Sequence, residues 1–110
     1  TRFLVKSGAR LFSVATEQAR YFFSEEGISF LVTKDGKKYS ISHTLDELEE
    51  LLHPADFFRI SRQMIVHIDS IKMVHKHFKG RLQIELQPPH EEDAMVSSRR
   101  VADFQAWLDR

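Results

Sequence analysis

The chain has 110 residues, of which 16 are basic and 16 acidic, so its formal net charge is zero, and it contains no cysteine. This length corresponds to one domain with a modest core, and 42% hydrophobic residues favour a folded globule over a disordered segment. The absence of cysteine excludes disulfides and thiolate metal sites, and it is typical of the cytoplasm. No apolar run approaches the roughly 20 residues that span a bilayer, and no basic-then-apolar leader marks secretion. We therefore expect a cytoplasmic domain with no membrane partner.

Charge is unevenly distributed along the chain, although it sums to zero. Residues 44–56 include five acids and no Lys or Arg, whereas residues 57–81 include six bases and one acid. A zero net charge counts against nucleic-acid binding, because neutralised phosphates supply much of that affinity. The segregation nevertheless predicts a basic face on a neutral molecule. Its members would be Arg59, Arg62, Lys72, Lys76, Lys79 and Arg81.

The first third of the chain predicts short strands separated by turn residues. Ser7-Gly8 and Asp35-Gly36 each lie between runs of β-branched and aromatic residues, which is the pattern of a β-hairpin. A polar run at 24–27 is expected to be a loop between the third and fourth strands. The expected strands cover residues 3–5, 11–14, 19–23, 28–33 and 38–42.

Thr44 begins the first predicted helix. Thr44 and Glu47 have the spacing of a capping box, and acids in the first turn suit the positive end of a helix. His53-Pro54 ends it, because the residue before a proline avoids the α region. One apolar stripe should pack this helix on the sheet, and it consists of Leu45, Leu48, Leu51 and Leu52.

Residues 57–71 form a densely apolar stretch that is interrupted by Ser61-Arg62-Gln63. A continuous buried strand would hide three polar side chains badly, so we predict two short strands with a turn or bulge between them. Such a turn would hold Arg62 and Gln63 outward, a pair suited to contacting phosphates or base edges. The alternative is an ordinary core strand with a solvated kink.

The last third predicts another hairpin, a short strand and a terminal helix. Lys79-Gly80 separates strands at 71–78 and 81–86, and the second of these alternates in polarity, as expected for one solvated face. After a polar connection, a strand at 94–96 leads to a helix that begins at Ser97 or Ser98. The apolar face of that helix consists of Val101, Phe104, Trp107 and Leu108.

Arg99 and Arg100 occupy the expected first turn of that helix, where acids are preferred. Cations there cost about 0.3–1 kcal/mol each through the helix dipole. Exposed backbone N–H groups together with two guanidinium groups would form an anion site. The alternative is two solvated arginines without a partner. Taken together, many strands, two separated short helices and no alternation of strand and helix predict a mainly β domain.

These residues resemble the LytTR-type DNA-binding domain, the output module of many bacterial response regulators. The family signature Phe-x-Arg-Ile-His-Arg-Ser-x-Ile-Val-Asn-x-x-x-Ile is matched by residues 57–71, and a Val-Ser-Arg-like run is matched by residues 96–101. The Asp35-Gly36 hairpin and the first helix fall in the family order, so the resemblance spans essentially all 110 residues. Ser61, Gln63 and His67 stand where the family usually has His, Ser and Asn.

The resemblance implies an elongated arrangement of small β-sheets that sends loops, not a helix, into successive major grooves of double-stranded DNA. Arg62 and Arg99 would contact base edges, as would Ile28 and Ser29 in a loop that commonly carries polar or aromatic residues in the family. The expected phosphate contacts are Gln63, Ser97, Arg100, Ser61 and Lys79.

The resemblance also implies a cytoplasmic transcription regulator of a two-component system, without a cofactor. Residues 1–110 would be a single domain excised from a longer regulator with an N-terminal receiver or sensor domain. We expect two copies to bind repeated half-sites on DNA.

Three other interpretations compete with DNA binding. An enzyme is disfavoured because no nucleophile, P-loop or dinucleotide motif occurs, and no catalytic residue is assigned. His75 and His77 share a predicted strand face, but a stable zinc site needs three or four ligands, so no metal site is assigned. A β-rich protein-interaction module using the same basic face remains the main alternative, and salt dependence distinguishes it from DNA binding.

Overall fold

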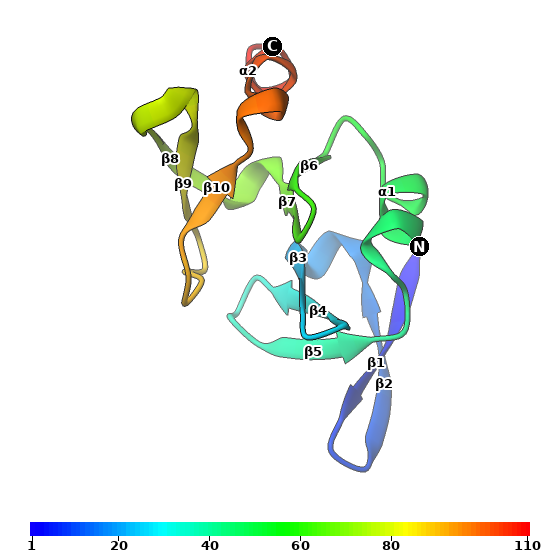
Figure 1. The fold of residues 1–110 in the computed structure, drawn as a ribbon. Coiled ribbons are helices and arrows are strands. Elements are labelled where there is room, and N and C mark those ends of the chain that lie inside the picture. The colour runs from blue at the N-terminus through cyan, green and yellow to red at the C-terminus, as the bar shows by residue number, and fades with distance from the viewer.

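Seven strands form the larger of two antiparallel sheets, in the order β2-β1-β5-β4-β3-β7-β6. Figure 1 shows this sheet in a computed structural model, which describes all 110 residues of the chain. Its members are β1 (Arg2–Ser7), β2 (Arg10–Ala15), β3 (Ala19–Glu25), β4 (Ile28–Thr33), β5 (Lys38–Ile41), β6 (Phe57–Ser61) and β7 (Met64–His67). The hairpins expected at Ser7-Gly8 and Asp35-Gly36 are confirmed by the β1–β2 and β4–β5 pairing.

The smaller sheet has the order β10-β9-β8 and consists of β8 (Ile71–Lys76), β9 (Leu82–Leu86) and β10 (Ala94–Val96). Two α-helices accompany the sheets, α1 (Leu45–Leu51) and α2 (Val101–Leu108), and neither is long and apolar enough to cross a membrane. Short 3-10 turns are η1 (Thr16–Gln18), η2 (Ile68–Ser70), η3 (Phe78–Gly80) and η4 (Ser98–Arg100). The molecule measures 44 × 26 × 23 Å, so the expected elongated, mainly β architecture is confirmed.

Side chains of the larger sheet alternate between two separate cores. On β3, Phe22 belongs to one core, while Tyr21 and Phe23 belong to the other. On β7, Ile65 and Val66 divide in the same way. The first core includes Leu45 and Leu48 of α1, and the second includes buried residues of β9 and β10 and Phe104 of α2. The larger sheet therefore lies between α1 on one face and the smaller sheet with α2 on the other, as Figure 1 shows.

The capping box predicted for α1 is confirmed. The Thr44 amide donates to Glu47 Oε1 at 2.8 Å, and the Glu47 amide donates to Thr44 Oγ1 at 3.1 Å. The predicted apolar stripe is wrong at one position, because Leu51 is 51% exposed while Leu45, Leu48 and Leu52 are buried. Leu51 is the last residue of this seven-residue helix and faces solvent, while the next residue, Leu52, packs in the core.

The predicted start of the terminal helix at Ser97 or Ser98 is confirmed for the helical backbone but not for the α-helix itself. Residues 98–100 form η4, α2 begins at Val101, and neither Ser97 nor Arg100 caps it with a side-chain hydrogen bond. Arg99 and Arg100 therefore lie in the 3-10 turn that precedes α2, still at the positive end of that helix. Within α2, Phe104 is fully buried, whereas Trp107 is only partly buried.

Candidate nucleic-acid interface

The predicted turn between β6 and β7 is confirmed. Ser61 pairs with Met64, so Arg62 and Gln63 form a two-residue turn with both side chains exposed. The register shifts between Arg59 and Ser61, which makes Ile60 the extra residue of a bulge. Buried apolar residues hold the turn on both strands, because Ile60 is 0% exposed on one and Ile65 is 2% exposed on the other.

Arg59 lies beneath this turn and connects it to α1. Its Nε donates to the Ser61 carbonyl at 3.1 Å, and its Nη2 donates to the Arg62 carbonyl at 2.7 Å. Its Nη1 contacts Asp46 Oδ1 at 2.5 Å and Glu49 Oε1 at 3.0 Å. The hydrogen bond from Arg59 lowers the pKa of Asp46, as expected for a carboxylate paired with a cation. Arg59 is therefore a paired cation and not, as predicted, a member of the basic face.

Two backbone hydrogen bonds bring distant segments to the β6–β7 turn. The Ser97 amide donates to the Ile60 carbonyl at 3.0 Å, and the Ser24 amide donates to the Gln63 carbonyl at 2.9 Å. The residues 97–100 thus begin beside the bulge, with Arg99 exposed and Arg100 partly buried. The Arg100 guanidinium donates to Ser97 Oγ at 3.2 Å.

Lys79 lies at the same end of the smaller sheet as Ser97. Leu82 pairs with both Val96 and Lys76, so the β8–β9 connection and the segment after β10 emerge side by side. Lys79 is exposed and has a positive φ of 61°. The basic face is thus smaller than predicted, because Lys72 lies elsewhere on β8 and contacts Glu85 at 3.5 Å. The predicted members that remain are Arg62, Lys76, Lys79 and Arg81. Arg99 and Arg100 extend this face, because they follow Ser97 at the same end of the smaller sheet.

The β3–β4 turn presents one of its two predicted contact residues. Glu26 and Gly27 both have positive φ, as in a tight hairpin turn. Ile28 is 49% exposed, but Ser29 is only 8% exposed and faces the interior. The Ser29 side chain therefore cannot reach a DNA base in this conformation.

Acidic residues border the other side of the β6–β7 turn. A groove of about 330 Å³ is lined by Ser61 and Gln63 together with Glu25, Glu92 and Asp93. These three carboxylates give the groove a negative potential, which disfavours a phosphate inside it.

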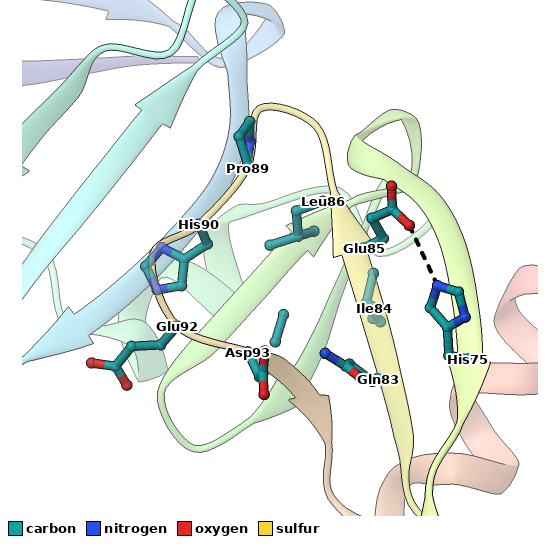
Figure 2. A pocket seen from close by; sticks show the side chains of 10 residues that line it. His75, Gln83, Ile84, Glu85, Leu86, Pro89, His90, Glu92 and Asp93 are labelled. Atoms are coloured by element: carbon teal, nitrogen blue, oxygen red, sulfur yellow. Dashed lines mark hydrogen bonds and ion pairs between the residues drawn. The ribbon is translucent and has the colours of Figure 1, made fainter.

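The histidines considered as metal ligands do not share a strand face. His75 Nε2 lies 3.4 Å from Glu85 Oε1, and their side chains point toward each other across β8 and β9 (Figure 2). That contact lowers the pKa of Glu85. His77 follows the end of β8 and packs on Phe78 at a ring distance of 5.0 Å. His90, Glu92 and Asp93 line the same hollow as His75, but no group of three such side chains is arranged to hold a metal ion.

Sequence reasoning located the exposed Arg62-Gln63 turn and missed the support beneath it. The sequence does contain a signal for this support, because an acidic segment directly precedes the basic one and their charges are complementary. The pairing of Asp46 and Glu49 with Arg59 needed the packing of α1, which no local pattern specifies.

Comparison with known proteins agrees with this geometry. The family model described as LytTr DNA-binding domain matches residues 9–109. A solved structure from Bacillus cereus, described as the LytTr DNA-binding domain of a methyl-accepting/DNA response regulator, superposes with a TM-score of 0.88. It is 18% identical, and the match covers 100% of this chain and 98% of that one, so it shows a shared fold. With the family match extending over nearly the whole length, the chain belongs to the LytTr DNA-binding domain family.

Proposed function

We propose that this domain binds double-stranded DNA with sequence specificity, as the output domain of a bacterial response regulator. It would insert the Arg62-Gln63 turn and residues 97–100 into the major groove. The observation that carries this proposal is that both segments meet at the Ser97–Ile60 hydrogen bond, with Arg62 and Arg99 both exposed. An upstream receiver domain would control the domain, and two copies would occupy repeated half-sites in the cytoplasm.

The contacts divide by chemistry into base contacts and phosphate contacts. Arg62 and Arg99 carry planar guanidinium groups that match guanine O6 and N7, and the exposed Ile28 can pack on a thymine methyl group. Phosphates would be held by Lys79 and Arg100, with Ser61, Gln63 and Ser97 as hydrogen-bond donors. The Ser29 side chain is buried and would not contact DNA.

Selection of bound sequences from a random DNA pool tests this proposal. A recovered consensus, with affinity that falls steeply as salt increases, is the expected result. Binding without a consensus would reduce the function to non-specific DNA association. No enrichment, together with binding to a protein partner that is insensitive to salt, would instead favour an interaction module that uses the same basic face.

A further inference from the structure

We propose that Arg59 is a positioning residue for DNA recognition, and that Asp46 and Glu49 of α1 hold it in place. This inference rests on the proposed function, because it assigns a role to residues behind the turn that carries Arg62. We call Arg59, Asp46 and Glu49 the clasp. The acidic helix α1 would itself repel DNA. Through the clasp, it nevertheless supports the DNA-binding turn.

The first step in the argument is that Arg59 cannot itself be a DNA contact. Its side chain is 12% exposed, and its guanidinium already donates to two carboxylates and two carbonyls. Hydrogen bonds between charged groups are shorter and stronger than neutral ones. An arginine with its donors satisfied in this way acts on the structure around it and not on an external phosphate.

The second step concerns what the guanidinium fixes. It contacts the carbonyls of Ser61 and Arg62, which are consecutive peptide groups of the exposed turn. Holding two consecutive carbonyls restricts the backbone dihedral angles at Arg62, and hence the direction in which its side chain leaves the turn. A recognition side chain needs such support to keep its productive geometry. The Arg59 guanidinium donates to two carbonyls and two carboxylates, four acceptors in all, whereas a lysine ammonium has only three N–H donors.

The third step is that the clasp and simple electrostatics predict opposite changes in DNA affinity when an acid of α1 is removed. Removing an acid raises the net charge by one, which strengthens attraction to DNA. If Glu49 acts only as a surface charge, its removal should therefore tighten binding. If Glu49 holds Arg59, its removal should weaken binding to the preferred site and reduce discrimination against a mutated site.

Glu49→Ala and Glu50→Ala form a matched pair for this test. Both remove one glutamate from an exposed position of α1, but only Glu49 contacts Arg59. Alanine is the best helix former, so neither change should unfold the helix. On the site recovered by selection, Glu50→Ala should bind as tightly as the unmodified domain or more tightly. Glu49→Ala should bind more weakly, and Asp46→Ala/Glu49→Ala should lose about fivefold or more, the lower end of one base contact.

A second measurement, amide hydrogen exchange, tests the rigidity of the β6–β7 turn in the absence of DNA. The Ser24 amide is bonded to the Gln63 carbonyl, so its hydrogen exchange reports opening of the turn. Exchange at Ser24 should become severalfold faster in Glu49→Ala and in Arg59→Lys, but not in Glu50→Ala. The Gly36 amide, bonded to the Thr33 carbonyl in a different hairpin, should be unchanged in all variants.

The outcomes separate the clasp from the proposed function. Equal affinities and equal exchange rates for Glu49→Ala and Glu50→Ala would overturn the clasp while leaving DNA binding intact. Faster exchange without any loss of affinity would overturn its role in recognition. If the unmodified domain selects no DNA, the proposed function fails and the DNA role of the clasp fails with it.

Discussion

The Ser97 amide and the Ile60 carbonyl form a 3.0 Å hydrogen bond that joins the residue after β10 to β6, an outer strand of the larger sheet. Arg62 lies two residues beyond Ile60, and Arg99 lies two residues beyond Ser97. One backbone contact therefore sets the spacing between two arginines that are far apart in the sequence. Their separate roles can be tested by substitution.

Arg62→Ala should cost about 1–3 kcal/mol of binding free energy and relax the base preference at one position. The stability of the fold should change little, because the side chain is exposed. Affinities for the selected site and for single-base variants, with a thermal unfolding control, measure both effects. Equal losses on all sequences would make Arg62 a phosphate contact.

Arg99→Gln and Arg100→Gln should impair DNA binding in different ways. Arg99→Gln should chiefly reduce discrimination between the preferred site and a mutated one. Arg100→Gln should weaken binding to all sequences and reduce the salt dependence by about one unit of slope. Stability should stay within about 0.5 kcal/mol for both, because the two residues precede α2 and are not buried. If affinity is unaffected in both variants, these arginines are structural.

Phe104 should matter more to the core than the single tryptophan. Phe104 is fully buried, so Phe104→Ala should lower the free energy of unfolding by about 3–5 kcal/mol. Trp107 is partly buried and donates from Nε1 to the Pro54 carbonyl at 2.9 Å. Trp107→Phe keeps most of the packing and should cost about 1 kcal/mol, the value of one hydrogen bond. Urea unfolding measures the loss in free energy of unfolding for each variant. A larger loss for Trp107→Phe than for Phe104→Ala would contradict this packing.

Stability should fall as the pH drops below about 6.5, the unperturbed value for histidine. Burial, followed by the charge of Arg20, lowers the pKa of His67, although Asp69 at 3.9 Å acts in the opposite direction. His67 Nδ1 accepts from the Asp69 amide at 2.9 Å, which requires the neutral ring. Between the lowered folded pKa and the unfolded value, the unfolded chain binds more protons, so acidification favours unfolding.

His67→Asn tests this assignment. Asparagine does not titrate, and its side-chain oxygen can accept the same amide hydrogen bond. The loss of melting temperature between about pH 7.5 and about pH 5.5 should be smaller in this variant. Part of the loss should remain, because burial also lowers the pKa of His90. An identical pH profile in both proteins would remove His67 as a cause.

Local signals in the sequence were sufficient for the strands, the hairpin turns and α1. Asp35-Gly36 and the Thr44–Glu47 capping box each specify their structure within a few residues. The Arg62-Gln63 turn was predictable for the same reason, since a polar triplet within an apolar stretch cannot remain buried. These features depend on neighbours in the chain and not on the tertiary arrangement.

The remaining features depend on contacts between distant segments. Ser97 and Ser98 look like helix caps, but the Ser97 amide is bonded to Ile60, and the chain makes a 3-10 turn before α2 begins. Ser29 belongs to the strand predicted at 28–33 and observed as β4, but its burial depends on what packs on that face of the strand, which the local pattern does not specify. The contact between Arg59 and α1 likewise appears only when the helix packs on the sheet.

The division of the larger sheet between two cores has a consequence for shortened versions of the domain. A chain ending before β8 would keep the larger sheet and α1 but lose the layer that covers Tyr21, Phe23 and Val66. It would then present an apolar sheet face to water, which favours self-association. It would also lack the strand that bonds to the Ile60 carbonyl. Such fragments should aggregate, so the smallest soluble unit includes both layers.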